Sequence, residues 1–412
     1  MRRVLSAILR LIVRLFFRRI EIAGEDKIPD GAGVIFAMNH PNGLVDPLLL
    51  LCFAPRPVSF LAKAPLFRYP LINIFVRGLD SIPVYRKTDA VAGTNQETFG
   101  RAREVLGRGG AVAIFPEGTT HSDARLKELK TGAARIALGA AAKTIAVVPA
   151  GIYYTQKQTF RSAALIIFGS PIMVQPQAVD EPAYDAVDAL TAEIERGLSE
   201  VTLQADSVAV LDLIARAERI FSSGEAGDLA FQLDLRRRFV AGYRYLCERD
   251  PERIAQFASR IERFEAGLRD AGLELDALMS SRGVVIRSIV AVILLPLAVV
   301  GLLIHYPAYW LIGFLARRFA RDEHEMQATY KLVAGLILYP LTWIACFFIA
   351  WWLPQIAPLL GYIALRVFES LDMMIGRAKT RARKETAQRL IAERTAIRAD
   401  IAAIAEEMGE RF

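Results

Sequence analysis

The chain has 412 residues, 53% of them hydrophobic, and a formal net charge of +7. A mean hydropathy of +0.30 is high for a wholly soluble protein and indicates membrane segments. The three cysteines, Cys52, Cys247 and Cys346, are widely separated in the sequence, which argues against a disulfide framework or a cysteine-based zinc site.

The first predicted element is an amphipathic helix over residues 1–20. It contains six arginines and no acidic residue. The arginines and the apolar side chains fall on different helix faces, which is typical of a helix that lies in the headgroup layer of an anionic membrane. The alternative is that this helix packs on its own domain.

Residues 21–175 are predicted to form an α/β domain, a mixed sheet flanked by helices. Short β-rich runs alternate with helical stretches in this part of the chain. The expected strands are residues 33–38, 58–61, 81–85, 111–115, 145–148 and 165–168. The expected helices are residues 47–53, 65–77, 89–107 and 132–142. In such sheets the loops at the strand ends form the site.

One of these loops joins a histidine to a carboxylate. His40 follows the first strand, Asn42-Gly43 is a turn signal, and Asp46-Pro47 is typical of a helix N-cap and first helical residue. A carboxylate behind an imidazole fixes its tautomer and lets it take a proton. The alternative is that Asp46 only caps its helix.

Charged residues also follow other strands. Arg86 is a planar, bidentate donor suited to phosphate, and Lys130 precedes a helix whose first N–H groups favour anions. Glu117 follows the strand at 111–115. Its carboxylate could orient a hydroxyl of a substrate, or it could bond only to the backbone. His121 is interpreted as a loop hydrogen-bonding residue rather than a base.

Four pieces in this order resemble the motifs of the glycerolipid acyltransferases, which acylate glycerol 3-phosphate and lysophosphatidic acid. They are Asn39-His40 with Asp46, Gly78 through Arg86, Phe115-Pro116-Glu117-Gly118, and Val148-Pro149. The resemblance covers roughly residues 20–175. Five residues rather than the common four separate His40 from Asp46, and Thr120-His121 stands where an arginine is usual. Both features are similar to the branch typified by fungal glycerol-3-phosphate acyltransferases.

The resemblance implies a membrane-bound enzyme that transfers a fatty acyl chain from acyl-CoA or acyl carrier protein to a glycerol phosphate. Neither a cofactor nor a metal is expected. The partners would be membrane lipids, the acyl donor and a phosphorylated glycerol or lysophospholipid acceptor. The implied catalytic residues are His40, Asp46 and Glu117, and the implied substrate-binding residues are Arg86, Gly118, Thr119 and Lys130.

Other functions stay open. The acceptor could be another lysolipid, such as an ornithine-type lipid, or the chain could be a catalytically silent membrane-binding scaffold of the same fold. Nucleic acid is not an expected partner, because the arginines lie beside apolar runs rather than in polar patches studded with aromatic residues.

The rest of the chain is predicted to be helical. Residues 176–281 are charged and rich in Ala and Leu, and helices are expected at 184–203, 208–222, 229–248 and 251–279. This region is interpreted as a helical lid or packing unit, with a surface for a partner as the alternative. Residues 282–365 are a membrane region. It contains uncharged runs at 288–316 and 332–365, each longer than one crossing needs.

We expect two membrane helices in that region, with a third left open near residues 354–365. Four prolines would kink or divide them: Pro296, Pro307, Pro340 and Pro354. Residues 366–412 form a charged helical tail. The protein is expected to be integral to a membrane, with the acyltransferase domain on the cytoplasmic side.

Overall fold

The computed structural model describes residues 2–409, apart from residues 69–72, 74–76, 78–79, 86–94, 143, 178, 180, 224–226, 280–283 and 321–323. The chain divides into two compact units. The first unit contains residues 1–206 and 322–329, and the second contains residues 207–321 and 330–412.

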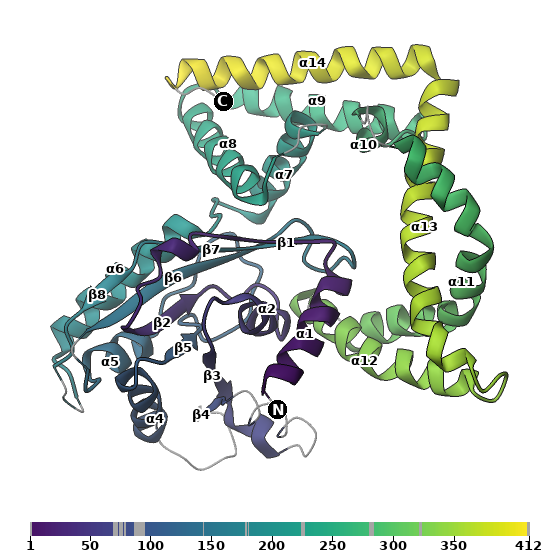
Figure 1. Ribbon diagram of the computed structural model, residues 1–412. Helices are drawn as coiled ribbons and strands as arrows, with labels where there is room; N and C mark the ends of the chain where they lie inside the picture. Colours follow the sequence, from purple (N-terminus) through teal and green to yellow (C-terminus); the bar gives the residue numbers. More distant parts are fainter. Residues whose placement is uncertain are drawn as a thin grey trace. The chain divides into compact units, whose positions relative to one another are not determined.

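The first unit is built on a mixed sheet (Figure 1). Its described strands are β1 (Arg19–Ala23), β2 (Gly33–Met38), β3 (Val58–Lys63), β4 (Ile82–Val84), β5 (Ala111–Ile114), β6 (Ile145–Tyr154), β7 (Ala163–Phe168) and β8 (Ile172–Val174). The order is β1-β7-β6-β2-β5-β3-β4, and β8 pairs with β6. β6 is antiparallel to β7 and β8, and the other pairs are parallel. The expected mixed sheet is confirmed, with the fully buried β2 at its centre.

Helices cover both faces of this sheet (Figure 1). The described helices within residues 1–206 of this unit are α1 (Arg2–Phe16), α2 (Val45–Phe53), α4 (Asn95–Gly107), α5 (Gly132–Leu138) and α6 (Tyr184–Val201), with short 3-10 turns at η1 (Glu25–Lys27) and η2 (Ala64–Arg68). α4, α5 and α6 pack on one face, and α2 with α1 lies on the other. Because α6 packs on β6, the structure divides the chain after Asp206 rather than at residue 175.

The strand expected to end at Val148 continues past Pro149 to Tyr154, so the predicted bounds of 145–148 are wrong. Proline has no N–H to donate within a sheet. β8 pairs with β6 up to Val147, and β7 pairs with it from Ala150 onward. Pro149 therefore lies where the partner of β6 changes from β8 to β7. At that position the missing N–H donor of proline costs little stability.

The N-terminal helix is shorter than expected. α1 ends at Phe16, and the following residues form β1, whose sequence Arg-Ile-Glu-Ile-Ala alternates as a strand does. One face of α1 is buried, through Leu9, Val13 and Phe16, and α1 packs on α2. Another face exposes Ile8, Leu11 and Leu15 to solvent. The structure thus contains both the packed face and an exposed apolar face.

Several predicted helices differ in extent. The helix expected at 65–77 begins as η2, and most of its remainder lies outside the described residues. α4 accounts for the second half of the helix expected at 89–107, whose first residues are likewise not described. α5 ends at Leu138 instead of residue 142.

The second unit contains a helical layer of α7 (Val208–Ser222), α8 (Leu229–Arg249), α9 (Pro251–Asp270), α10 (Leu275–Met279) and α14 (Lys384–Glu407). The predicted break at Asp250-Pro251 is confirmed, because the Asp250 carboxylate caps α9 by accepting from the Arg253 N–H, 3.1 Å away. The single helix expected at 251–279 is wrong. α9 ends at Asp270, shortly before Gly272, whose φ of +54° is one that glycine adopts without strain.

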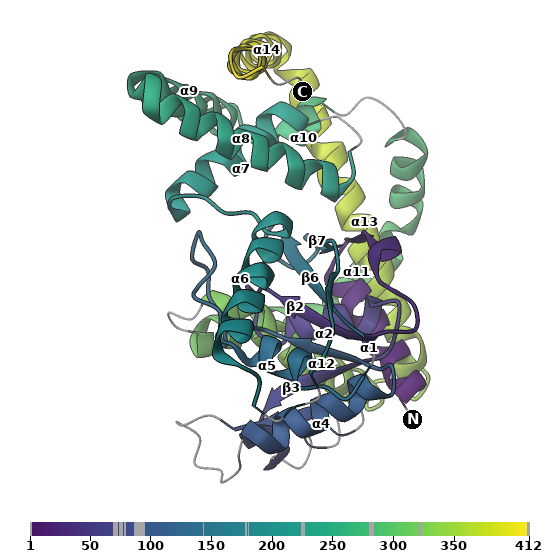
Figure 2. The same ribbon diagram turned by 90° about the vertical axis from the view of Figure 1, so that its left-hand side faces the viewer.

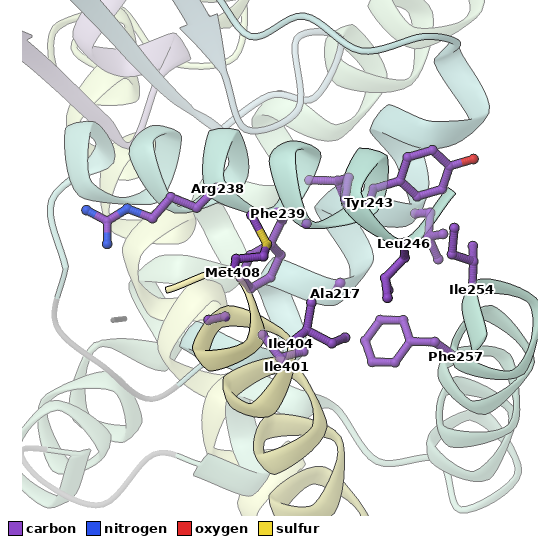
Figure 3. Close-up of a pocket in the computed structure, with 14 residues that line it drawn as sticks. Ala217, Arg238, Phe239, Tyr243, Leu246, Ile254, Phe257, Ile401, Ile404 and Met408 are labelled. Atoms are coloured by element: carbon purple, nitrogen blue, oxygen red, sulfur yellow. The ribbon is translucent and has the colours of Figure 1, made fainter. Parts of the chain in front are cut away.

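The charged tail packs into this layer. α14 contacts α7 and α9, and Arg253 pairs with Glu407 at 2.9 Å. An apolar cavity of about 60 Å³ lies among α7, α8, α9 and α14 (Figure 3). Phe239, Leu246 and Phe257 line it, and its polar side chains are Arg238 and Tyr243. This lining has no acid–base pair, so the cavity is not a candidate catalytic site.

The membrane region forms α11 (Val284–Ala320), η3 (His324–Met326), α12 (Gln327–Cys346) and α13 (Leu353–Ala382). Two described segments are long and apolar enough to cross a membrane, Ile289–Ala320 and Gln327–Cys346. The prolines at 296, 307 and 340 lie inside continuous helices. The second uncharged run is instead divided between α12 and α13, just before Pro354.

α11 and α13 lie side by side (Figure 1, Figure 2). Small residues make this possible, since Ala298 and Ala364 are buried in the contact and Gly301 lies directly against the α13 backbone. The outward-facing side chains of the pair are large and apolar; for example, Ile293 and Leu303 are each 69% exposed. Such a surface suits lipid rather than water.

Candidate active site

His40 and Asp46 form a hydrogen-bonded pair at the end of β2. His40 Nδ1 lies 2.8 Å from Asp46 Oδ2. The turn that brings them together is closed by the Val45 N–H, which donates to the Asn42 carbonyl at 2.9 Å, and it has a φ of +40° at Gly43. The Asp46 side chain is fully buried, whereas the His40 side chain is 17% exposed. The pair thus combines a buried carboxylate with an imidazole that substrate can reach.

The contacts of Asp46 determine the tautomer of His40. Besides His40, the Asn42 N–H donates to Oδ2 at 2.7 Å and the Tyr154 hydroxyl donates to Oδ1 at 2.5 Å. A carboxylate only accepts, so Nδ1 of His40 must carry the proton and Nε2 must carry the lone pair. Among the described residues, Nε2 has no hydrogen-bond partner. His40 is therefore arranged to accept a proton at Nε2.

Tyr154 remains a donor across the physiological range. Burial, and secondarily the neighbouring Asp46 charge, raises the pKa of the Tyr154 hydroxyl well above its ordinary value of 10. Sequence reasoning missed this residue because the strand was expected to end at Val148. The alternation along a longer strand would have placed Tyr154 on the same sheet face as Ile152.

The loop around His40 is fixed from three sides. The imidazole stacks on the Phe115 ring, with centroids 4.0 Å apart and planes 18° from parallel. The His40 carbonyl accepts from the His121 N–H at 3.3 Å. The Asn39 amide exchanges two hydrogen bonds with the backbone of Ile152, at 2.7 and 3.1 Å. β2, β5 and β6 therefore all contribute to the position of the imidazole.

Glu117 lies buried on the neighbouring loop. Its Oε2 accepts from the Lys127 N–H at 2.8 Å and from the ring of His121. His121 Nδ1 accepts from the Asp123 N–H at 3.2 Å, so its Nε2 carries the proton donated to Glu117. Oε1 of Glu117 is buried without a hydrogen-bond partner among the described residues. One carboxylate oxygen thus fixes the loop, and the other is a buried acceptor that no described donor satisfies.

The predicted substrate-binding residues are only partly brought together. Gly118 has a φ of +70°, which disfavours any other residue there, and the Lys130 side chain lies directly against it. The Lys130 N–H donates to the Pro116 carbonyl at 2.8 Å. Thr119 is exposed beside them. Arg86 lies outside the described residues.

Lys157 is a further charged residue of this site. Its backbone carbonyl accepts from the Asn42 side chain at 2.9 Å, and its Nζ donates to the Pro41 carbonyl at 3.3 Å and to Ser122 Oγ. It follows β6 in a connection whose sequence contains no motif, so nothing in the sequence pointed to it. Where the chain is described, no group of three or more His, Cys, Asp or Glu residues could hold a metal ion.

Comparisons with known proteins relate part of this chain to a family. Residues 19–153 match the model of the family described as Acyltransferase. The chain is 29% identical over 275 residues to glycerol-3-phosphate O-acyltransferase 1 of Saccharomyces cerevisiae, covering 60% of this chain and 36% of the yeast protein. The chain therefore spans little more than a third of that relative's length.

Two bacterial proteins are also similar. The 1-acyl-sn-glycerol-3-phosphate acyltransferase of Borreliella burgdorferi is 28% identical over 172 residues, which are 42% of this chain and 64% of that protein. The crystal structure of PlsC, the 1-acyl-sn-glycerophosphate acyltransferase of Thermotoga maritima, covers 48% of this chain and 81% of its own, with 21% identity and a TM-score of 0.35. The family match confirms the resemblance read from the four motifs for this part of the chain.

Proposed function

We propose that this chain, whose residues 19–153 are an acyltransferase-family domain, transfers a fatty acyl group from a thioester donor to a hydroxyl of a glycerol phosphate. The observation that carries the proposal is the His40–Asp46 pair, with Nδ1 bonded to a fully buried carboxylate and Nε2 left as the basic nitrogen. Glycerol 3-phosphate or 1-acylglycerol 3-phosphate is the acceptor, as the names of the relatives suggest.

The reaction needs a base of near-neutral pKa at the acceptor hydroxyl. His40 Nε2 takes the hydroxyl proton as the oxygen attacks the thioester carbonyl and the new C–O bond forms. The tetrahedral intermediate then collapses, the C–S bond breaks, and the leaving thiolate takes the proton back from the imidazolium. Asp46 stabilises the imidazolium without itself being protonated. No cofactor is needed, and acyl-CoA or acyl carrier protein serves as co-substrate.

Glu117, Lys130 and Arg86 serve the acceptor in this proposal. The unsatisfied Oε1 of Glu117 orients the acceptor by accepting from one of its hydroxyls. Lys130, beside Gly118, and Arg86 bind the phosphate, and Gly118 and Thr119 border it. His121 does not take the place of the usual third-motif arginine as a phosphate ligand, because its Nε2–H is donated to Glu117.

The protein works as an integral membrane protein with its acyltransferase domain at the cytoplasmic surface. Basic residues concentrate on the cytoplasmic side of membrane proteins. Arg317, Arg318, Arg321 and Lys331 flank the connection between α11 and α12. This connection belongs to the same compact unit as the acyltransferase domain, so the two share one side.

The experiment is an acceptor panel. Purified full-length protein in lipid vesicles is given labelled long-chain acyl-CoA together with glycerol 3-phosphate, 1-acylglycerol 3-phosphate, a lyso-ornithine lipid or an unphosphorylated glycerol. Label transfer to a phosphorylated acceptor, and not to glycerol, supports the proposal. Transfer only to the lyso-ornithine lipid would show that this lysolipid, and not a glycerol phosphate, is the acceptor. Transfer to no acceptor, from either acyl-CoA or acyl carrier protein, would favour the silent scaffold.

A further inference from the structure

The connection between α11 and α12 is attached to the catalytic loop. The Leu44 N–H, just before α2, donates to Thr329 Oγ1 at 3.0 Å. Thr329 and Met326 lie so close to Gly43 that a Cβ there would be 2.7 Å from Thr329 Oγ1 and 3.0 Å from the Met326 sulfur. The C-terminal end of α11 is therefore followed, within a few residues, by a segment packed on the His40–Asp46 turn.

A charge network joins the same segment to the site. Ser122 Oγ donates to Glu325 and accepts from Lys157 Nζ. Burial lowers the pKa of Lys157, and the negative charges of Glu325 and then Asp46 oppose that shift. Glu325 thus supplies a counter-charge for a cation that is buried beside the catalytic turn, which makes this contact specific rather than incidental.

The segment that leads to the N-terminal end of α11 begins with a link too short to cross a bilayer. α6 ends at Val201 and α7 begins at Val208, and the short link between them is bonded to the acyltransferase domain through the Ala205 N–H and the Ala124 carbonyl, 2.9 Å apart. Six extended residues reach about 20 Å, less than the roughly 30 Å of a hydrocarbon core. From α7 to α10, the described residues contain no candidate membrane span.

We infer that α11 does not place its two ends on opposite sides of the bilayer, and that α11, α12 and α13 enter the leaflet facing the active site and return to the same side. A single crossing by α11 would carry Glu325 and Thr329 across the membrane, away from the Gly43 and Ser122 contacts.

The turn between α12 and α13 fits this arrangement. Phe348 is 86% exposed, Ile349 81% and Trp351 70%. The turn lies in the middle of the uncharged run at 332–365. A connection that emerged into water on either side would expose these side chains to it, whereas a tip that ends within lipid buries them. The partner of this surface is the leaflet that faces the active site.

This inference builds on the proposed function and adds the route of the lipid substrate. With both ends of the apolar helices on one side, the His40 loop is held at the surface of the leaflet into which these helices insert. An acceptor or product that bears an acyl chain would then move laterally between that leaflet and the site without crossing the bilayer.

The test is cysteine labelling in sealed vesicles. Cys52 and Cys346 are replaced by alanine, and the exposed Cys247 on α8 is kept as the reporter for the side of the α7–α10 helices. Two further proteins add Arg318→Cys, at the exposed C-terminal end of α11, or Ile349→Cys, at the apolar tip. A membrane-impermeant maleimide is applied before and after detergent, and the labelled fraction at each site is compared with that of Cys247 in the same protein.

The two topologies give opposite results. The inference expects position 318 to be labelled to the same extent as Cys247 in intact vesicles, and position 349 to be labelled only after detergent. Labelling of position 349 in intact vesicles, with position 318 protected until detergent, would show that α11 and α12 each cross the bilayer and would overturn the inference. Neither result depends on enzymatic activity, so a failure of the proposed acyl transfer is recognised separately in the acceptor panel.

Discussion

The Tyr154 hydroxyl, at the end of β6, donates to Asp46 Oδ1 across 108 residues of sequence. It occupies the carboxylate oxygen that His40 leaves free, so the orientation of the catalytic pair depends on a residue outside the four motifs. A hydrogen bond to a buried charged group contributes about 1.5–3 kcal/mol.

Replacing Tyr154 by phenylalanine tests that dependence. Tyr154→Phe should lower the free energy of unfolding by about 1.5–3 kcal/mol and reduce kcat, because Asp46 then has one donor fewer and His40 loses part of its support. Tyr153→Phe makes the same chemical change at the neighbouring position, whose side chain points to the opposite face of the strand, and should leave kcat unchanged. Equal kcat values for the two variants would show that the Tyr154 bond does not position the pair.

The raised pKa of Tyr154 also predicts a pH dependence. Below pH 10 the hydroxyl is protonated in both the folded and the unfolded state, so its contribution is fully present. Above pH 10 the unfolded chain loses this proton while the folded protein keeps it, so stability falls with pH by about 1.4 kcal/mol per unit until the folded pKa is passed. Denaturant titrations should show a steeper decline for the wild type than for Tyr154→Phe above pH 10. Parallel declines would contradict the assignment.

Thr329 should act as a positioning residue for the catalytic turn. Thr329→Val keeps the shape but removes the acceptor of the Leu44 N–H, and a small displacement of a reacting group can cost up to about 100-fold in rate. We expect kcat to fall by about 10- to 100-fold with little change in either KM. Thr329→Ser retains the hydroxyl and should restore the rate. If the valine and serine variants have the same kcat in vesicles, the hydrogen bond has no role in positioning.

Arg86 and Lys130 should determine the affinity for the acceptor's phosphate. Arg86→Ala and Lys130→Ala should each raise the KM for the phosphorylated acceptor more than the KM for the acyl donor. Arg101→Ala removes a charge from the exposed face of α4 and serves as the control. If only the KM of the acyl donor rises, Arg86 and Lys130 bind the donor and not the phosphate of the acceptor.

Membrane anchoring should have two components. The full-length protein should remain in the membrane through high salt and alkaline wash, because α11 and α12 are long and apolar. A chain that ends at Ser281 should be released by one of these washes, since α1 contributes only exposed residues such as Leu11 and its arginines to the headgroup layer. Release of the full-length protein, or retention of the shortened chain, would contradict this division. A melting curve of the shortened chain checks that it is folded.

The motifs identified the acyltransferase domain because strand-to-helix bends have local signals. The Asn42-Gly43 turn and the buried strand before His40 lie within a few residues of each other, and the structure contains both. The predicted N-cap at Asp46 is wrong, because α2 already begins at Val45 after Leu44 and the Asp46 carboxylate bonds to His40 instead of capping the helix. The fold class followed from the same local alternation.

What the sequence did not reveal depends on contacts between distant residues. Tyr154 reaches Asp46 only because β6 runs past Pro149 beside β2. Glu325 lies just before α12 and Thr329 lies in its first turn, and no local pattern relates them to a turn about 285 residues earlier. The predicted length of the N-terminal helix was too great. The alternating polar and apolar residues of β1 follow α1 almost directly, so the sequence shows no clear end to the amphipathic pattern.

The most direct test of the account is the turnover number of His40→Ala beside that of His121→Ala, measured in vesicles with the acceptor found in the panel. Each of the two rings is bonded to a fully buried carboxylate, Asp46 or Glu117. His40 differs in that its second nitrogen has no partner among the described residues, whereas both nitrogens of His121 are engaged. His40→Ala should lower kcat by at least about 100-fold, and His121→Ala should cost much less. Equal losses in two folded variants would contradict the assignment of His40 as the base.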